Sequence, residues 1–190
     1  VHLMAIYAVV YMFTVQFSWW TIALAAVWYL LCGISITAGY HRCFSHAAYK
    51  AHPALRAFYL LFGSASFQNS ALNWCGDHRA HHADTEGPED PYSIQRGFWW
   101  AHMGWVLHHG ASHDSRVRDL ASQKLMRLQD RYWMAIGTVV GLVIPMSLGL
   151  LWGDPIGALL VAGFLRLVLQ LHVTFTVNSV AHLFGSRPYS

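Results

Sequence analysis

An uncharged stretch at the start of the chain constrains the fold more than any other feature. Residues 1–40 contain no Asp, Glu, Lys or Arg, and as one helix they would reach roughly 60 Å at about 1.5 Å per residue. Because a bilayer core is about 30 Å thick, we expect two membrane spans that are broken near residues 16–20. A secretory signal peptide is not expected, since the stretch has neither a basic leader nor a small-residue cleavage pattern.

Two further apolar stretches predict a second helical hairpin. Residues 132–152 carry no charge and have aromatic rings at both ends, and such rings favour the lipid headgroup boundaries. Residues 156–181 carry a single charge, Arg166, which we expect to face the bundle interior because a charge is costly against lipid. Only 11% of the residues are charged, against roughly 25% in soluble domains. The chain is therefore predicted to be an all-α integral membrane protein with four transmembrane helices in two hairpins.

The charges predict the orientation and the domain organisation. Ten of the twelve Lys and Arg residues lie in residues 41–131, which the four spans place on one side, and the positive-inside rule assigns that side to the cytoplasm. We expect one domain, residues 1–190, with spans in 1–40 and 132–182 and a cytosolic or interfacial helical cap in 41–131. Within the cap, residues 96–110 are rich in Trp and too short to span, which predicts a helix lying in the interface.

A cluster of histidines predicts a metal site on the cytoplasmic side. The stretch "DHRAHH" places His78, His81 and His82 within five residues, and on a helix the last two lie about 60° and about 40° from the first. Three protonated imidazoles this close would repel one another, whereas neutral imidazole is the commonest metal ligand in proteins. We therefore expect these side chains to share a cation. The acidic stretch "TEGPEDP" that follows is expected to be a solvated turn.

Two other stretches supply candidate ligands on the same side of the membrane. The stretch "HRCFSH" holds His41 and His46, which would lie about 140° apart on an α-helix. We therefore expect a helix to end between them, so that the chain bends back. The stretch "NSVAH" places Asn178 and His182 one helical turn apart at the cytoplasmic end of the last span. The sequence leaves the role of His102, within the Trp-rich segment, open.

These motifs together resemble those of a known family. The stretches "GYHRCFSH", "DHRAHH", "DPYSIQRGFWWAHMGW" and "NSVAHLFGSRPYS" occur in the order found in integral-membrane fatty acid desaturases of the acyl-CoA delta-9, or stearoyl-CoA, type and their bacterial relatives. The resemblance covers nearly the whole chain. It implies an oxidoreductase of unsaturated fatty acid biosynthesis, in which two histidine-bound iron ions and O2 introduce a cis double bond into a saturated acyl chain. Imidazole also suits zinc, copper and nickel, so the choice of iron comes from the resemblance.

The resemblance also assigns roles to individual residues. The implied metal ligands are His41, His46, His78, His81, His82 and His182, with Asn178 holding a metal-bound water. The implied substrate-tunnel residues are Tyr29, Gly33, Gln68, Asn69, Trp74 and Thr174. The family has a further H-x-x-H-H box downstream, and these 190 residues contain no second such box. We therefore expect a fragment, truncated at both ends, that cannot hold a complete di-iron site or be active alone.

The substrate, the partners and the reaction each have alternatives. Gly76 stands where animal relatives carry a basic residue that helps hold the CoA headgroup, which weakens the case for CoA recognition. Long-chain acyl-CoA is still expected as the substrate, with an acyl-lipid or a carrier-protein thioester as the alternative. The sequence has no flavin, nicotinamide or haem fingerprint, so electrons are expected from a ferredoxin, rubredoxin or cytochrome b5-like partner. The lipid bilayer is the other expected partner, and nucleic acid is not expected to be one. A membrane di-iron hydroxylase is the alternative enzyme, and a metal transporter or sensor is the non-enzymatic alternative.

Overall fold

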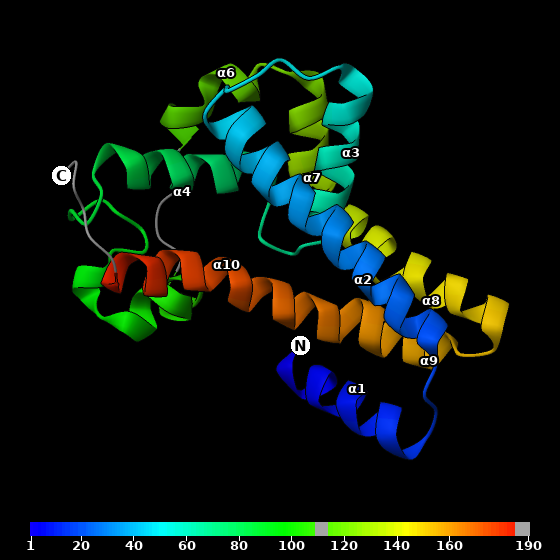
Figure 1. Cartoon of the computed structure of the whole chain (residues 1–190). Coiled ribbons are helices and arrows are strands. Elements are labelled where there is room, and N and C mark those ends of the chain that lie inside the picture. Colours follow the sequence, from blue (N-terminus) through cyan, green and yellow to red (C-terminus); the bar gives the residue numbers. More distant parts are fainter. Residues whose placement is uncertain (109–113, 185–190) are drawn as a thin grey trace.

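The protein is built from helices over the part of the chain that the structure describes. The structure is a computed structural model that describes residues 1–108 and 114–184, and every regular element within them is helical (Figure 1). The α-helices are α1 (His2–Thr14), α2 (Trp19–Ile34), α3 (Pro53–Ser64), α4 (Ala71–Ala83), α5 (Trp105–Leu107), α6 (Arg118–Ala121), α7 (Lys124–Thr138), α8 (Ile144–Gly149), α9 (Pro155–Gly157) and α10 (Arg166–Leu183). The wider π-helical segments are η1 (Ser35–Ser45), η3 (Trp100–Gly104), η5 (Val139–Val143) and η7 (Ala158–Leu165), and the 3-10 turns are η2 (Ile94–Arg96), η4 (Asp114–Val117) and η6 (Leu150–Trp152).

Three continuous helices are long and apolar enough to cross a membrane. They comprise Trp19–Ser45 with 27 residues, Lys124–Trp152 with 29 and Pro155–Leu183 with 29. The first expected span corresponds to α1, whose 13 residues reach only about 20 Å at about 1.5 Å per residue. The prediction of a helical membrane protein is therefore confirmed, while the four-span arrangement and the cytosolic cap stay predictions.

The long helices continue past the ends of the uncharged stretches that mark them in the sequence. The helix that begins at Trp19 runs on past residue 40 to Ser45. The helix that ends at Trp152 begins at Lys124 rather than at residue 132. The added segment of α7, about two turns, is amphipathic and charged, and it buries Met126 and Gln129 against the protein. Helical structure is set by backbone hydrogen bonds and packing rather than by the membrane boundary. An uncharged stretch therefore indicates the part of a helix that can lie in the membrane, and not the residue at which the helix ends.

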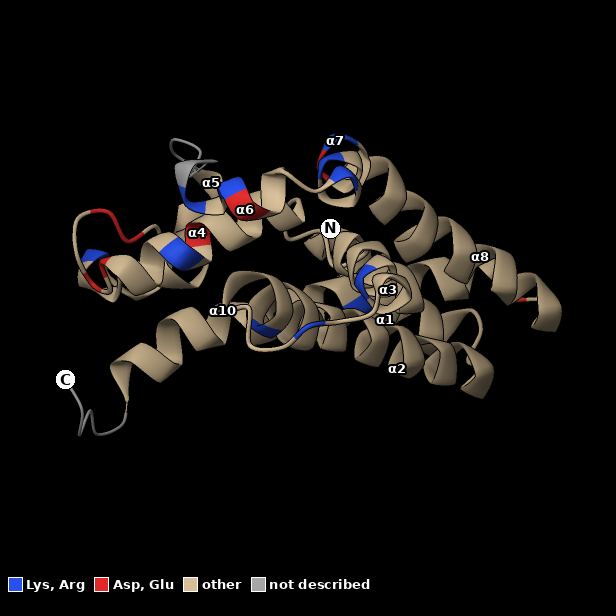
Figure 2. Cartoon of the chain, turned by 90° about the horizontal axis from the view of Figure 1, so that it is seen from above, with Lys and Arg blue, Asp and Glu red and all other residues tan. Residues whose placement is uncertain are grey.

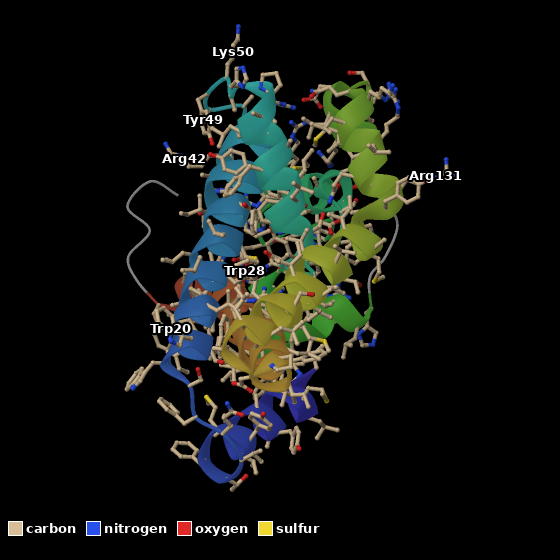
Figure 3. All side chains as sticks on the ribbon, turned by 90° about the vertical axis from the view of Figure 1, so that its right-hand side faces the viewer. Trp20, Trp28, Arg42, Tyr49, Lys50 and Arg131 are labelled. Carbon is tan, nitrogen blue, oxygen red and sulfur yellow. The ribbon has the colours of Figure 1, made fainter. Side chains whose placement is uncertain are left out.

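The spans pack around the continuous helix formed by η7 and α10. Figure 1 shows α2 crossing over this helix and α1 lying along it, and both α1 and α2 contact η7. Trp28 is buried between helices, and its indole nitrogen donates to the Val140 carbonyl at 2.8 Å. Trp20, by contrast, is 70% exposed and lies on the outer side of the bundle, as Figure 3 shows. Large exposed apolar side chains of this kind fit a surface that faces lipid.

Charged residues gather at one end of the bundle. Figure 2 shows Lys, Arg, Asp and Glu around α4, α6 and α7, whereas the turn between α8 and α9 at the opposite end is nearly uncharged. That turn holds Asp154, whose carboxylate accepts hydrogen bonds from Tyr11 at 3.0 Å and Thr21 at 2.8 Å. The Gly157 amide donates to the same carboxylate at 2.9 Å. One buried acid therefore ties α1 and α2 to the hairpin turn, with its oxygens satisfied.

Arg166 is a buried cation at the centre of the bundle. It is 2% exposed, which confirms that it faces the interior. Its guanidinium donates to the carbonyl of Ala65 at 2.9 Å, that of Ala162 at 3.0 Å and that of Gly141 at 3.3 Å. Ala65 is the C-cap residue of α3, where the final carbonyls of a helix lack partners within the helix. Because a cation is also favourable at a helix C-terminus, Arg166 anchors the end of α3 inside the bundle.

Replacement of Arg166 by methionine should destabilise the bundle. The variant Arg166→Met keeps most of the side-chain length but leaves buried carbonyls without a donor, so the free energy of unfolding should fall by about 2–4 kcal/mol. Chemical denaturation in detergent micelles measures this change. Arg131 is exposed, so Arg131→Met should change the value by less than about 0.5 kcal/mol. Equal effects of the two variants would contradict the anchoring role.

Candidate metal centre

The first pair of histidines is brought together by π-helical winding. The backbone amide of His46 donates to the carbonyl of His41 at 3.1 Å, a bond between residues five apart that defines a π-helical turn. Such a turn places residues five apart on the same side of the helix. The two imidazole rings lie 4.6 Å apart between centroids, and their Nε2 atoms are 3.1 Å apart. The helix does end at Ser45, but the expected bend of the chain between the two histidines is wrong, because π-helical hydrogen bonding continues to the His46 amide and aligns the rings.

The second pair comes from α4, which crosses the end of η1. Ser70 caps α4, since its side chain accepts from the Asn73 amide at 3.2 Å. His78 and His82 then lie one turn apart on the face toward η1, with ring centroids 4.6 Å apart. The Nε2 atoms of His46 and His78 are 2.9 Å apart. The four histidines that converge, with one ligand atom from each within 4.8 Å of the others, are His41, His46, His78 and His82.

The electrostatics of α4 favour neutral imidazoles in this cluster. Burial, together with the neighbouring histidines His41, His82 and His46, lowers the pKa of His78 to about 2. Burial also lowers the pKa of His82. Trp74 stacks on the His78 ring at 5.0 Å between centroids and covers one of its faces. Neutral imidazoles with converging nitrogens are the form that binds a metal.

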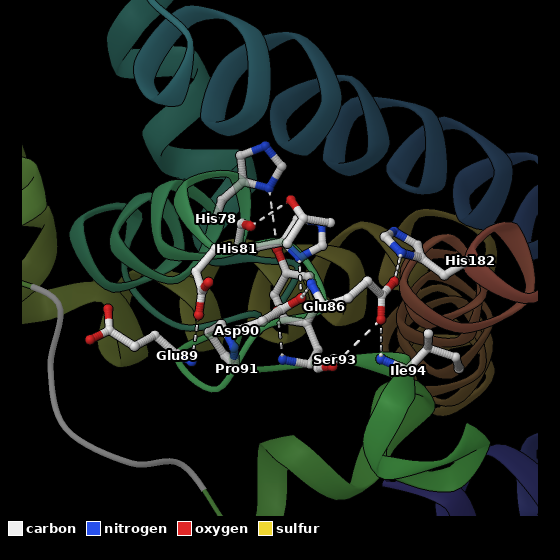
Figure 4. Close-up of polar contacts among 12 residues, drawn as sticks. His78, His81, Glu86, Glu89, Asp90, Pro91, Ser93, Ile94 and His182 are labelled. Carbon is white, nitrogen blue, oxygen red and sulfur yellow. Dashed lines mark hydrogen bonds and ion pairs between the residues drawn. The ribbon is translucent and has the colours of Figure 1, made fainter. Parts of the chain in front are cut away.

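His81 and His182 form a second group beside the four-histidine cluster. Their ring centroids are 5.1 Å apart, although they come from α4 and from the far end of α10. His81 donates from Nδ1 to Asp90 at 2.8 Å, and His182 donates from Nδ1 to Glu86 at 2.6 Å (Figure 4). A carboxylate on Nδ1 fixes the tautomer and leaves the lone pair on Nε2, which is the usual arrangement behind metal-bound histidine.

The two carboxylates were missed by sequence reasoning. Asp90 is 1% exposed, so the expected solvated turn is wrong at this residue. Its carboxylate also accepts from the amides of Glu86 at 2.9 Å and Tyr92 at 3.1 Å, and Glu86 accepts from the Ile94 amide at 3.1 Å. These bonds fold the loop back onto α4. These two carboxylates could have been found from the sequence, because each buried imidazole needs a second hydrogen-bond partner and the nearest acids can supply it.

Among the described residues the other buried histidine is His102, which packs against α10. Its Nδ1 lies 3.0 Å from the hydroxyl of Ser179, and its Nε2 lies 3.0 Å from Nδ1 of His172. The ring also stacks on Phe98 at 5.4 Å. The Trp-rich segment is helical over residues 98–107, as predicted, while residues 109–110 of the expected helix lie outside the described residues. Its position in the membrane interface stays a prediction.

An apolar cavity of about 420 Å³ opens beside the cluster. Its lining includes two of the clustered histidines, His41 and His78, and the predicted residues Gln68, Asn69, Trp74, Thr174 and Asn178. Gln68 links two of the lining side chains, because it donates to Thr174 at 2.9 Å and accepts from the Trp74 indole at 3.2 Å. Tyr29 and Gly33 are not among the lining residues, and a Cβ added at Gly33 would meet no atom within 4 Å. The tunnel roles of all these residues stay predictions.

Comparison with known proteins identifies the class to which this fold and site belong. The chain is a helical membrane protein whose histidine cluster could hold a metal ion. Residues 17–190 match the family model described as "Fatty acid desaturase", and the chain belongs to that family. Membership of this family implies a metal cofactor.

Individual relatives agree with this assignment. The chain is 41% identical to the probable acyl-CoA desaturase of Schizosaccharomyces pombe, over 98% of this chain and 39% of that protein. It is 37% identical to the stearoyl-CoA desaturase of Sus scrofa and 36% identical to that of Homo sapiens. Each of these two alignments covers 99% of this chain and 54% of the relative. The chain therefore spans about half or less of the length of these relatives.

Loss of one clustered imidazole should weaken metal binding. Co2+ reports on the histidine environment through its visible absorption, and His46→Ala should reduce its affinity by more than about tenfold, since even groups behind the ligands contribute 10–100-fold. Titration of the purified chain in detergent measures the effect. His108 is exposed and lies outside the cluster, so His108→Ala is the matched control. The same affinity in both variants would exclude His46 as a ligand.

Proposed function

We propose that this chain carries histidine ligands and part of the acyl-chain site of an O2-dependent acyl-CoA desaturase, which introduces a cis delta-9 double bond into a saturated acyl chain. The observation that carries the proposal is the position of the four-histidine cluster beside an apolar cavity. The cavity volume lies within the roughly 300–1,000 Å³ typical of small-molecule sites. The printed names of the relatives, acyl-CoA and stearoyl-CoA desaturases, support this substrate class.

The donor set fits iron, although it suits several other metals as well. When bound, iron would supply the oxidising power that removal of hydrogen from an unactivated methylene requires. His41, His46, His78 and His82 would hold one ion. His81 and His182, with Asp90 and Glu86 behind them, would contribute to the second. Asn178, which lines the cavity, would hold a metal-bound water.

The protein's own part in the reaction is to hold the acyl chain and to exclude water. Apolar side chains dominate the cavity wall, so an alkyl chain is favoured there over solvent. The hydrogen bonds from Gln68 to Thr174 and from Trp74 to Gln68 satisfy polar groups of the wall with each other. A methylene held beside His41 and His78 is thereby presented to the metal site, and a dry site limits side reactions.

The charged end of the protein supports an orientation in the membrane and a side on which an electron donor would dock. We infer that four spans hold the chain in the membrane with the histidines and a helical cap facing the cytoplasm, since the Lys and Arg residues gather at that end (Figure 2). Electrons would then come from a ferredoxin, rubredoxin or cytochrome b5-like protein that docks on this side. Long-chain acyl-CoA remains the proposed substrate, with an acyl-lipid as the alternative.

Product analysis tests the proposed reaction. Expression of the full-length protein in a host that lacks its own desaturase should produce fatty acids with a new cis double bond, and His78→Ala should abolish them because a ligand is lost. Gas chromatography with mass spectrometry locates the double bond. His108→Ala should leave the product unchanged. Hydroxylated chains without new alkenes would instead establish the hydroxylase alternative.

Site-directed labelling tests the proposed orientation. Ala83 and Phe184 are exposed near the histidine groups, and Trp19 is exposed at the start of α2. The single variants Ala83→Cys and Phe184→Cys should react with a membrane-impermeant maleimide only from the cytoplasmic side. The variant Trp19→Cys should not react from that side. The native cysteines, Cys32, Cys43 and Cys75, are buried and supply the background. Labelling of positions 83 and 184 from opposite sides would overturn the arrangement.

A further inference from the structure

Arg79 lies within the histidine motif of α4 but engages a different part of the protein. It lies between His78 and Ala80 in the sequence, and about 100° of helical rotation turns its side chain away from the face of His78. Its guanidinium makes five hydrogen bonds. Nε donates to Ser45 O at 3.0 Å, Nη2 to Phe44 O at 2.8 Å and Asp119 Oδ2 at 3.0 Å, and Nη1 to Arg116 O and Asp119 Oδ1, both at 2.7 Å. These bonds match the five donors of a guanidinium.

Two of the acceptors of Arg79 lie where the first histidine pair ends. Phe44 and Ser45 are the last residues of η1, and His46 follows directly. The final carbonyls of a helix have no partner within it, and a cation there is favoured by the helix dipole. The planar guanidinium reaches two successive carbonyls and a carboxylate together, which an ammonium group cannot do in the same geometry.

We propose that Arg79 is a positioning residue that holds the two histidine pairs in register before any metal binds. Converging neutral imidazoles gain little from one another, so their placement needs an external constraint. Arg79 supplies it by bonding α4, which carries His78 and His82, to the two residues that precede His46. The Cys75 thiol also contacts the Tyr40 carbonyl, at 3.5 Å, one turn earlier on both helices. The inference rests on the proposed metal site but not on the identity of the metal.

Asp119 has the smaller part in this arrangement. It accepts two hydrogen bonds from Arg79, and these bonds lower the pKa of its carboxyl group. However, its side chain is 58% exposed, against 22% for Arg79, and exposed ion pairs contribute little to stability. We therefore assign to Asp119 the orientation of the guanidinium plane. The contacts of Arg79 with the carbonyls of Phe44 and Ser45 fix the position of one histidine pair relative to the other.

Two measurements on the chain in detergent test the proposal. Nitroxide labels on exposed positions next to the two pairs, Ala48→Cys and Ala83→Cys, report the register by dipolar EPR without any metal. Arg79→Gln should broaden the label distance distribution and lower the Co2+ affinity by about 10–100-fold, the range typical of groups that orient metal ligands. Arg79→Lys should restore only part of the affinity. Asp119→Asn should have a smaller effect than Arg79→Gln, and the exposed control Arg118→Gln should have none.

The outcomes separate this inference from the proposed function. A folded Arg79→Gln variant with the wild-type distance distribution and the wild-type Co2+ affinity would overturn the positioning role. Failure of the wild-type chain to bind Co2+ would contradict the metal site, while the metal-free distance distributions would still decide the role of Arg79. If Arg79→Gln does not fold, Arg79→Lys and Asp119→Asn supply the same two readouts. Wild-type values in both of those variants would overturn the proposal.

Discussion

The backbone of the second helix changes from α-helical to π-helical winding at Ser35, and the histidine cluster depends on that change. An α-helix would point His41 and His46 about 140° apart, so they could not share an ion. The π-helical bond between the His46 amide and the His41 carbonyl adds a residue to the turn, as often happens at functional sites. The backbone remains hydrogen-bonded throughout, which is essential where a helix leaves a membrane. The cluster is thus assembled without breaking the span that carries it.

The apolar bundle is connected to this cluster through buried polar side chains. Gln129, which is 2% exposed, donates to Tyr40 at 3.0 Å and to Ser64 at 2.8 Å, and accepts from the amide of Ala71 at 3.0 Å. It therefore joins α7, η1 and α3 to the first turn of α4. Arg166 performs the corresponding role deeper in the bundle. Since each of these groups has several partners, loss of one would leave buried polar atoms unsatisfied, and the helix positions that present the histidines are fixed accordingly.

The sequence predicts those features that depend on local spacing. The uncharged stretches indicate the apolar helices, the single charge Arg166 indicates a bundle interior, and the spacing of His78 and His82 predicts a shared helical face. The sequence also predicts His81 as a ligand, but its pairing with Asp90, apart from the four-histidine cluster, could not be predicted, because it depends on how a loop folds back on α4. The alignment of His41 with His46 depends on π-helical winding, which no periodicity at about 100° per residue reveals. Long-range contacts and changes of helix type therefore mark the limit of the sequence argument.

The residues of the motif "DHRAHH" make three different kinds of contact within little more than one turn of α4. At about 100° per residue, His82 lies about 40° from His78, Arg79 lies about 60° beyond His82, and His81 lies about 60° from His78 on the other side. The middle of this arc faces the four-histidine cluster. One flank bonds the end of η1 through Arg79, and the other faces Asp90. A shift of one residue in this register would turn a guanidinium toward the imidazoles and place a positive charge where a cation must bind, so the order of the residues matters as much as their number.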